Sequence, residues 1–162
     1  MAVRSFRPVV DEKTRVLILG LMPGPESLRR KQYYGHPQNA FCGILGDVIG
    51  EKIVEKTHDD RLRALLGHRI GLWDVYASCE REGASDTRIR NASHNAIPRL
   101  LASHPSIEKV VFNGTKAGSA ARLIEGNVAC VIAPSTSPAH TMPYAKKLAA
   151  WKRALKAPTN SI

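Results

Sequence analysis

The chain has 162 residues, of which 43% are hydrophobic and 24 are Lys or Arg against 14 Asp or Glu. This length and hydrophobic content predict one soluble globular domain over residues 1–162, with a core at about 14–156. The formal net charge of +10 favours a polyanionic partner, because neutralised phosphates release counterions, but a basic protein without such a partner fits equally well.

Cysteine content and apolar runs exclude several classes of protein. The three cysteines, Cys42, Cys79 and Cys130, are scattered, which excludes a disulfide framework and a CxxC metal site and favours a reducing compartment. The first eight residues lack the apolar core of a signal peptide, and no apolar run is long enough to span a bilayer. We therefore expect a cytoplasmic monomer with no membrane partner.

The spacing of apolar residues predicts alternating strands and helices. In chain order, we expect a strand at 16–19, helices at 41–53 and 60–66, a strand at 70–75, a helix from about 95 to before Pro105, a strand at 109–112, a helix at 115–124, a strand at 128–132 and a helix at 143–156. The strand segments are β-branched and almost continuously apolar, as in parallel strands covered on both faces. This predicts an α/β fold, a three-layer α/β/α sandwich around a mostly parallel four-stranded sheet.

Residues 76–93 show no periodic pattern. They combine several charged residues with Gly83, Ser85 and Asp86. We expect a long irregular loop there, which is either functional or simply solvated.

A polar loop follows the first predicted strand. It begins at residues 20–24 (GLMPG) and continues into residues 34–41 (YGHPQNAF). Loops at the carboxyl ends of parallel strands form the ligand crevice of such folds. The loop lacks GxxxxGK[ST] and GxGxxG, which disfavours nucleoside triphosphates and dinucleotides. Within it, Asn39 suits either a helix N-cap or the positioning of a water molecule, and Tyr34 suits either core packing or stacking on a base.

A second polar loop, residues 134–140 (PSTSPAH), follows the last predicted strand, so we expect the two loops to converge. Asn113 ends the strand at 109–112 and is either a turn residue before Gly114 or a side chain that pairs with the N–H and C=O edge of a base. Lys116 follows at the start of a helix, where a phosphate could bind.

Taken together, these loops resemble the uracil-DNA glycosylase superfamily, and most closely its hypoxanthine-DNA (deoxyinosine) glycosylase branch. The resemblance runs from about Val16 to Trp151 and includes residues 72–75 (LWDV) and 79–83 (CEREG), for which no chemical role is evident. It implies a monofunctional DNA glycosylase of base excision repair. Such an enzyme flips a deaminated base, above all hypoxanthine, out of DNA and hydrolyses its N-glycosidic bond, leaving an abasic site. The resemblance implies no metal and no organic cofactor.

The resemblance also implies roles for residues of the first loop and of the strand at 109–112. Asn39 is the expected catalytic residue, which holds the attacking water near the anomeric carbon. Tyr34 is expected to stack on the extruded base, and Asn113 to read its edge. Met22 is assigned to the base-binding site, where related families carry a catalytic Asn or Asp.

The second loop is expected to grip DNA phosphates beside the flipped nucleotide. Ala133 stands where the superfamily usually has His or Asn, which argues against robust uracil excision. Three cysteines cannot hold the iron–sulfur cluster of two other families in the superfamily. The residues assigned to DNA contacts are Ser135, Thr136, Ser137, His140 and Lys116.

Three alternatives remain open from the sequence. The first is a mismatch-type glycosylase for uracil or xanthine. The second is a non-catalytic DNA damage-binding module, suggested by Met22 and Ala133. The third is a hydrolase of small nucleotides, which would leave the net charge of +10 unexplained.

Overall fold

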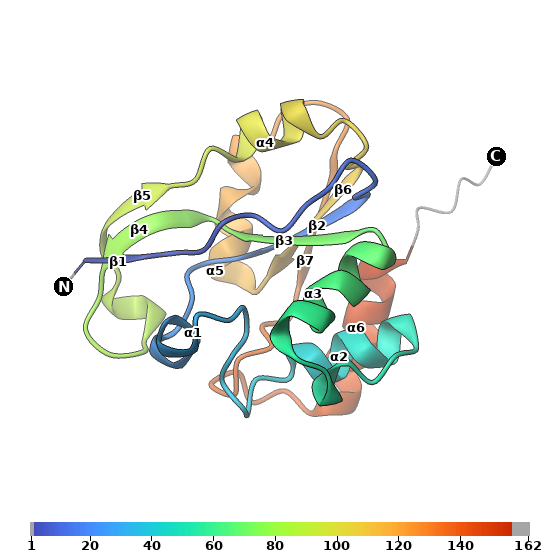
Figure 1. The fold of residues 1–162 in the computed structure, drawn as a ribbon. Coiled ribbons are helices and arrows are strands. Elements are labelled where there is room, and N and C mark those ends of the chain that lie inside the picture. Colours follow the sequence, from blue (N-terminus) through green and yellow to red (C-terminus); the bar gives the residue numbers. More distant parts are fainter. Residues whose placement is uncertain (1, 157–162) are drawn as a thin grey trace.

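The computed structural model describes residues 2–156, and its centre is a four-stranded, all-parallel sheet (Figure 1). The strand order is β3–β2–β6–β7, so β2 lies between β3 and β6. The strands are apolar because helices cover both faces, and every residue of β3 is buried. The four predicted strands are confirmed as β2 (Val16–Gly20), β3 (Ile70–Asp74), β6 (Lys109–Asn113) and β7 (Ala129–Ala133).

Helices pack on both faces of this sheet and complete three layers. Alternate side chains of a strand point to opposite faces. Thus Ile18 packs in a cluster with Phe41 and Trp151, whereas Leu17 and Leu19 pack on the other face. Figure 1 shows α4 on one side of the sheet and α2, α3 and α6 on the other. The predicted sandwich is confirmed, with α2 (Phe41–Ile49), α3 (His58–Gly67) and α6 (Tyr144–Leu155) on one face and α4 (Ile97–Ser103) and α5 (Thr115–Gly118) on the other.

Two predicted helices are shorter than expected. The helix predicted at 41–53 ends at Ile49, because Gly50 takes the left-handed conformation (φ 77°) that terminates helices. The short 3₁₀ helix η1 (Ile53–Glu55) follows it. The segment predicted as a helix at 115–124 continues beyond α5 as another 3₁₀ helix, η3 (Ser119–Leu123).

The first polar loop contains a helix that the sequence analysis did not predict, α1 (Pro25–Arg30). Pro25 occupies its first turn, where a missing N–H costs nothing. Glu26 accepts hydrogen bonds from Arg29 and Arg30 on the next turn of the helix. This short helix separates the GLMPG turn from the segment that carries Tyr34.

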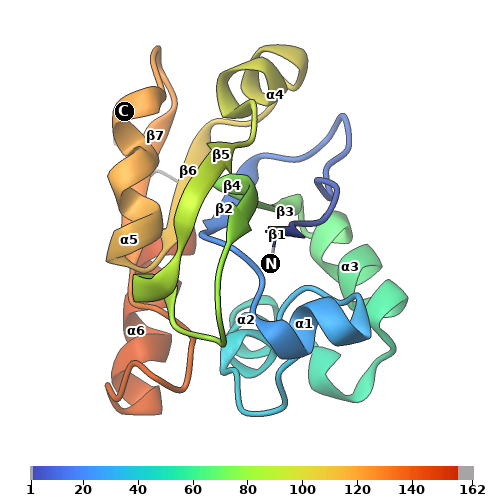
Figure 2. The same cartoon turned by 90° about the vertical axis from the view of Figure 1, so that its left-hand side faces the viewer.

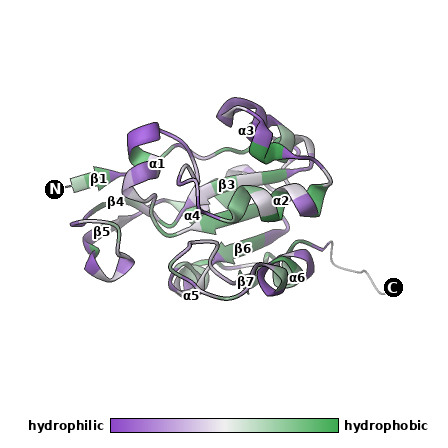
Figure 3. Cartoon of the chain, turned by 90° about the horizontal axis from the view of Figure 1, so that it is seen from below, coloured by the Kyte–Doolittle hydropathy of each residue, from purple (hydrophilic) through white to green (hydrophobic). Residues whose placement is uncertain are grey.

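Residues 76–93 form a hairpin, so the expected long loop is wrong. Strands β4 (Tyr76–Glu80) and β5 (Arg90–His94) pair antiparallel, with η2 (Asp86–Arg88) between them, and β1 (Ala2–Arg4) joins the outer edge of β4. These strands carry mainly polar residues and lack the alternation that marks a strand in sequence. This sheet lies beside the parallel one in Figure 1 and in front of it in Figure 2, and Figure 3 shows that α1 and the hairpin tip are largely hydrophilic.

Helix α6 anchors the loop that follows β7. Trp151 is fully buried, and its indole Nε1–H donates a hydrogen bond to the carbonyl of Pro134 at 2.8 Å. Trp151→Phe removes this donor, so we expect it to lower the free energy of unfolding by about 1–2 kcal/mol beyond the loss from reduced side-chain volume. Chemical denaturation measures the change.

Trp73→Phe is the matched control, because Trp73 is also largely buried, on the other face of the sheet. Equal losses of stability in the two variants would show that the bond to Pro134 contributes nothing.

Candidate active site

The carboxyl-terminal residues of the four parallel strands line up in one row across the sheet. Gly20 pairs with Asp74, and Asn113 pairs with Ala133. Since residues two apart on a strand share a face, this row points to the same side as Ile18, toward α2, α3 and α6. We call these four residues the strand-end row. The glycine within it lets the Asp74 carboxyl group lie against the strand, because a Cβ atom on Gly20 would be only 2.6 Å from Asp74 Oδ1.

Tyr34 lies above this row. Its backbone is left-handed (φ 53°), and its ring stacks on Phe41 with centroids 3.8 Å apart and planes 12° apart. Its hydroxyl lies 3.2 Å from the point that a Cβ atom on Gly20 would occupy. Burial raises the pKa of Tyr34 well above its ordinary value, so the phenol is neutral. The aromatic residue predicted from the motif thus faces the end of the sheet, and its stacking on a base stays a prediction.

Asp74 is the residue of this site that the sequence analysis missed. It is 4% exposed, and its Oδ2 has no hydrogen-bond partner among the described residues. Its Oδ1 lies 2.6 Å from the Cβ position on Gly20. Burial, assisted by the negative charge of Asp86, raises the pKa of Asp74 to about 7. The available signal was a carboxylate that ends an otherwise apolar strand, IGLWD.

Asn113 joins the strand-end row to the second loop. Its Nδ2 donates to Thr136 Oγ1 at 3.0 Å, and its Oδ1 accepts from the Thr136 backbone N–H at 2.9 Å. The same amide also interacts with the Tyr34 hydroxyl, and recognition of a base by Asn113 stays a prediction.

Thr136 has a different role from the one expected. It was assigned to DNA contacts, but it is 1% exposed and its hydroxyl is bound to Asn113. Its side chain therefore holds the loop in place and does not face outward.

The two polar loops meet at Thr136. The Ala40 N–H donates to the Thr136 carbonyl at 3.0 Å, which places the neighbouring Asn39 beside the second loop. Asn39 Oδ1 accepts from the Phe41 N–H at 2.9 Å at the start of α2. The N-cap of α2 is Ala40, so Asn39 is not the helix N-cap but closes a turn onto the first N–H of the helix, while its Nδ2 group keeps its hydrogens for other partners.

The remaining residues of the second loop are positioned by backbone contacts. The hydroxyl oxygens of Ser135 and Ser137 each accept a hydrogen bond from the backbone N–H two residues further on. The hydroxyl hydrogens therefore stay available to donate to another group. His140 is exposed. Beneath the loop, the buried Lys147 donates to the Ser137 carbonyl at 3.2 Å, and burial lowers the pKa of this lysine.

The first loop rests on the hairpin. Met22 is only 8% exposed, and the next carbonyl, that of Pro23, accepts a hydrogen bond of 2.7 Å from Arg81 Nη2. Arg81 is 7% exposed, and its Nη1 has no hydrogen-bond partner among the described residues. Arg81 is a second residue that the sequence analysis missed, because its contact crosses 58 positions of the chain.

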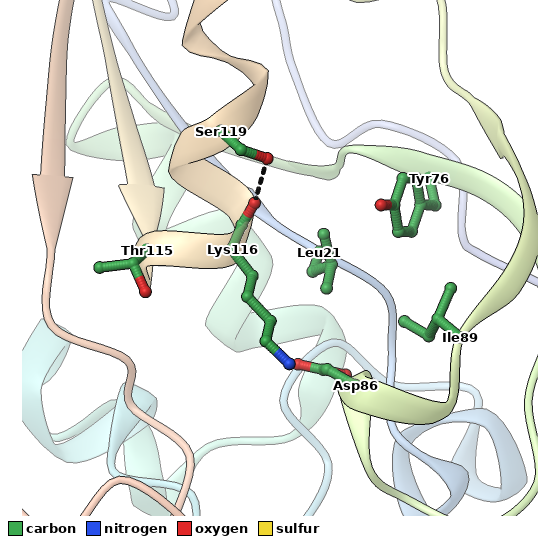
Figure 4. A pocket seen from close by; sticks show the side chains of 7 residues that line it. All are labelled: Leu21, Tyr76, Asp86, Ile89, Thr115, Lys116 and Ser119. Carbon is green, nitrogen blue, oxygen red and sulfur yellow. Dashed lines mark hydrogen bonds between the residues drawn. The ribbon is translucent and has the colours of Figure 1, made fainter.

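A cavity of about 430 Å³ lies next to this site, between the hairpin and α5 (Figure 4). The exposed Lys116 extends across it toward Asp86. The lining of this cavity includes no residue of the strand-end row, so Lys116 is not part of the cluster around Asn113. A second cavity, of about 350 Å³, lies within the hairpin. The larger cavity is lined by Leu21, Tyr76, Asp86, Ile89, Thr115, Lys116 and Ser119.

Between residues 2 and 156, no three His, Cys, Asp or Glu side chains gather in a way that could hold a metal ion. None of the helices in this described part is long and apolar enough to cross a bilayer.

Comparison with known proteins identifies the family. Residues 7–157 match the model of the uracil DNA glycosylase superfamily. The chain belongs to this superfamily. Two proteins named hypoxanthine DNA glycosylase are similar to it. One, from Methanosarcina barkeri, is 45% identical over 73% of this chain and 75% of that protein, and one, from Methanosarcina acetivorans, is 40% identical over 78% and 80%.

The fold of the superfamily is also found in a solved structure. The solution NMR structure of a Methanosarcina acetivorans protein, provisionally assigned as a uracil DNA glycosylase, has a TM-score of 0.86 and 36% identity. It covers 94% of this chain, and the match covers 96% of that protein. The resemblance described from the sequence is therefore confirmed, and so is the fold that it implied.

The contact between Asn113 and Thr136 can be tested by removing one hydroxyl. Thr136→Val keeps the shape of the side chain but leaves Asn113 Nδ2 without its partner, so we expect a loss of about 1–3 kcal/mol of unfolding free energy. Chemical denaturation measures it. Thr141→Val makes the same change at an exposed position and should have little effect, and equal behaviour of the two variants would contradict the proposed support of the loop.

The burial of Asp74 predicts a pH-dependent stability. Because its folded pKa is raised, the folded protein holds this proton more tightly, and ionisation destabilises the fold as pH rises from about 4 toward 7. Asp74→Asn removes that cost, which is on the order of a few kcal/mol. We expect the melting temperature of the variant to be higher than that of the wild type at pH 8, and the difference to be much smaller at pH 4. A gain that does not depend on pH would show that Asp74 titrates normally.

Proposed function

We propose that this protein is a monofunctional DNA glycosylase that removes hypoxanthine from DNA and leaves an abasic site. The observation that carries the proposal is the convergence of the Asn39 turn and the second loop beside the strand-end row, through the Ala40–Thr136 and Asn113–Thr136 hydrogen bonds. The names of the two curated relatives support hypoxanthine as the base.

Hydrolysis needs a water molecule held in line with the breaking C–N bond. Asn39 is the proposed positioning group at the anomeric carbon, since its Nδ2 group stays available beside the second loop. An amide is a poor base, so its contribution is orientation while the sugar passes through an oxocarbenium-like state.

Base recognition follows from the strand-end row. Tyr34 stacks on the flipped base, Asn113 pairs with its N–H and C=O edge, and Met22 lines the site. Stacking is worth roughly 1–3 kcal/mol per base and offsets part of the cost of flipping.

The DNA backbone is held by exposed or half-exposed groups around this row. Hydroxyl hydrogens of Ser135 and Ser137, together with His140 and Lys116, are the proposed phosphate contacts. The net charge of +10 adds a sequence-independent attraction to DNA. The proposal entails a DNA-associated cytoplasmic protein that acts as a monomer.

Excision from labelled duplexes that carry a single inosine, uracil or xanthine tests the proposal. We expect alkali-sensitive cleavage at inosine, and a loss of about 10²-fold or more in rate for Asn39→Ala, because the positioned water is lost. Asn127→Ala, at an exposed position, is the matched control and should keep the wild-type rate.

The other outcomes select the alternatives. Faster cleavage at uracil or xanthine would indicate a mismatch-type glycosylase. Tight binding of inosine DNA without an abasic product would indicate a damage-binding module, and hydrolysis of free inosine alone would indicate a nucleotide hydrolase. Intact DNA with the wild-type protein overturns the proposed activity.

A further inference from the structure

A buried carboxyl group at a ligand-binding edge needs an explanation. Asp74 ends β3 within the strand-end row, and Oδ2 has no partner among the described residues. Buried polar atoms without partners are rare and costly in folded proteins. An oxygen left free beside a proposed base-binding site points to a partner that arrives with the substrate.

The absence of a side chain on Gly20 allows this carboxyl group to lie where it does. Asp74 Oδ1 and the Tyr34 hydroxyl lie 2.6 Å and 3.2 Å from the one point that a Cβ atom on Gly20 would fill. A side chain at this position would clash with the carboxyl group, so glycine is what allows both polar groups to lie against the end of β2. A planar base stacked on Tyr34 would bring its polar edge toward these two groups.

We propose that Asp74, as a neutral carboxylic acid, donates a hydrogen bond to the carbonyl oxygen of the flipped deaminated base and stabilises the negative charge of the departing base. This inference rests on the glycosylase activity proposed above. Deamination creates that carbonyl by replacing an amine. A neutral acid offers it a donor, whereas a carboxylate, which only accepts, repels it.

The charge balance of the reaction explains why a donor at this position accelerates it. As the C1′–N bond breaks, its electron pair moves to the base, and part of the charge collects on the carbonyl oxygen. The oxygen of water bonds to C1′, and the proton that it loses ends on the base. Asp74 keeps its own proton throughout, so its role is electrostatic stabilisation by a preorganised donor in a dry site.

The surroundings of Asp74 favour the neutral form. The titratable groups near it are the phenols of Tyr33 and Tyr34, both neutral because burial raises their pKa, and the carboxylate of Asp86, whose charge acts on Asp74. The Asp86 charge raises the pKa of Asp74 further, so Asp74 is largely protonated below about pH 7.

The pH profile of single-turnover excision from inosine DNA tests this role. The wild-type rate should be constant below about pH 6.5 and fall about tenfold by pH 8, as Asp74 ionises. Asp74→Asn keeps a permanent neutral donor, so its rate should stay flat over this range and exceed the wild-type rate at pH 8. Asp74→Ala should be at least tenfold slower than the wild type below pH 6.5. A merely structural role would not flatten the profile of the Asn variant.

A second variant tests the same point without altering Asp74. Asp86→Asn removes the repelling charge, so the alkaline fall in rate should move to lower pH. If the wild type excises hypoxanthine and both Asp74→Asn and Asp86→Asn keep the wild-type pH profile, the role of Asp74 is overturned and the proposed function stays intact. No excision by the wild type at any pH would overturn the proposed function itself.

Discussion

The double hydrogen bond between the Asn113 amide and Thr136 is the contact on which the site depends. It ties the end of β6 to the loop after β7. The carbonyl of the same threonine then receives the Ala40 N–H and so draws in the first loop. Trp151 and Lys147 fix this second loop from α6. Through its hydroxyl, its N–H and its carbonyl, the buried Thr136 thus joins segments that are about a hundred residues apart, and its N–H fixes the orientation of the Asn113 amide.

Burial around Gly20 determines the chemistry that this edge of the sheet can perform. The missing side chain lets Asp74 and the Tyr34 hydroxyl both lie against the end of β2, and burial keeps the phenol neutral and raises the pKa of Asp74 to about 7. A row with a bulkier residue at that position would force the carboxylate aside. The hairpin contributes as well, since Arg81 holds the Pro23 carbonyl of the first loop and Asp86 adds its charge.

The parallel sheet and its two helical layers could be predicted from the sequence, because apolar β-branched runs and helical spacing are local signals. The loop motifs also identified Asn39, Tyr34 and Asn113 as candidate site residues. The polar strands β4 and β5 could not be predicted, because their sequences lack the alternation of apolar and polar residues that marks a strand. They form strands by pairing with each other in the fold. Asp74 was missed for a similar reason, because its burial and unpaired oxygen follow from neighbours that only the fold supplies.

The central claim, that a flipped base is held over the strand-end row, is tested most directly by a crystal structure. Asn39→Ala bound to a duplex with a single inosine would trap the substrate before hydrolysis. The account predicts hypoxanthine stacked on Tyr34 above Gly20, with its carbonyl oxygen within hydrogen-bond distance of Asp74 and its edge facing Asn113. A base seated instead in the cavity lined by Tyr76 and Lys116, or one that stays stacked in the duplex, would contradict the account.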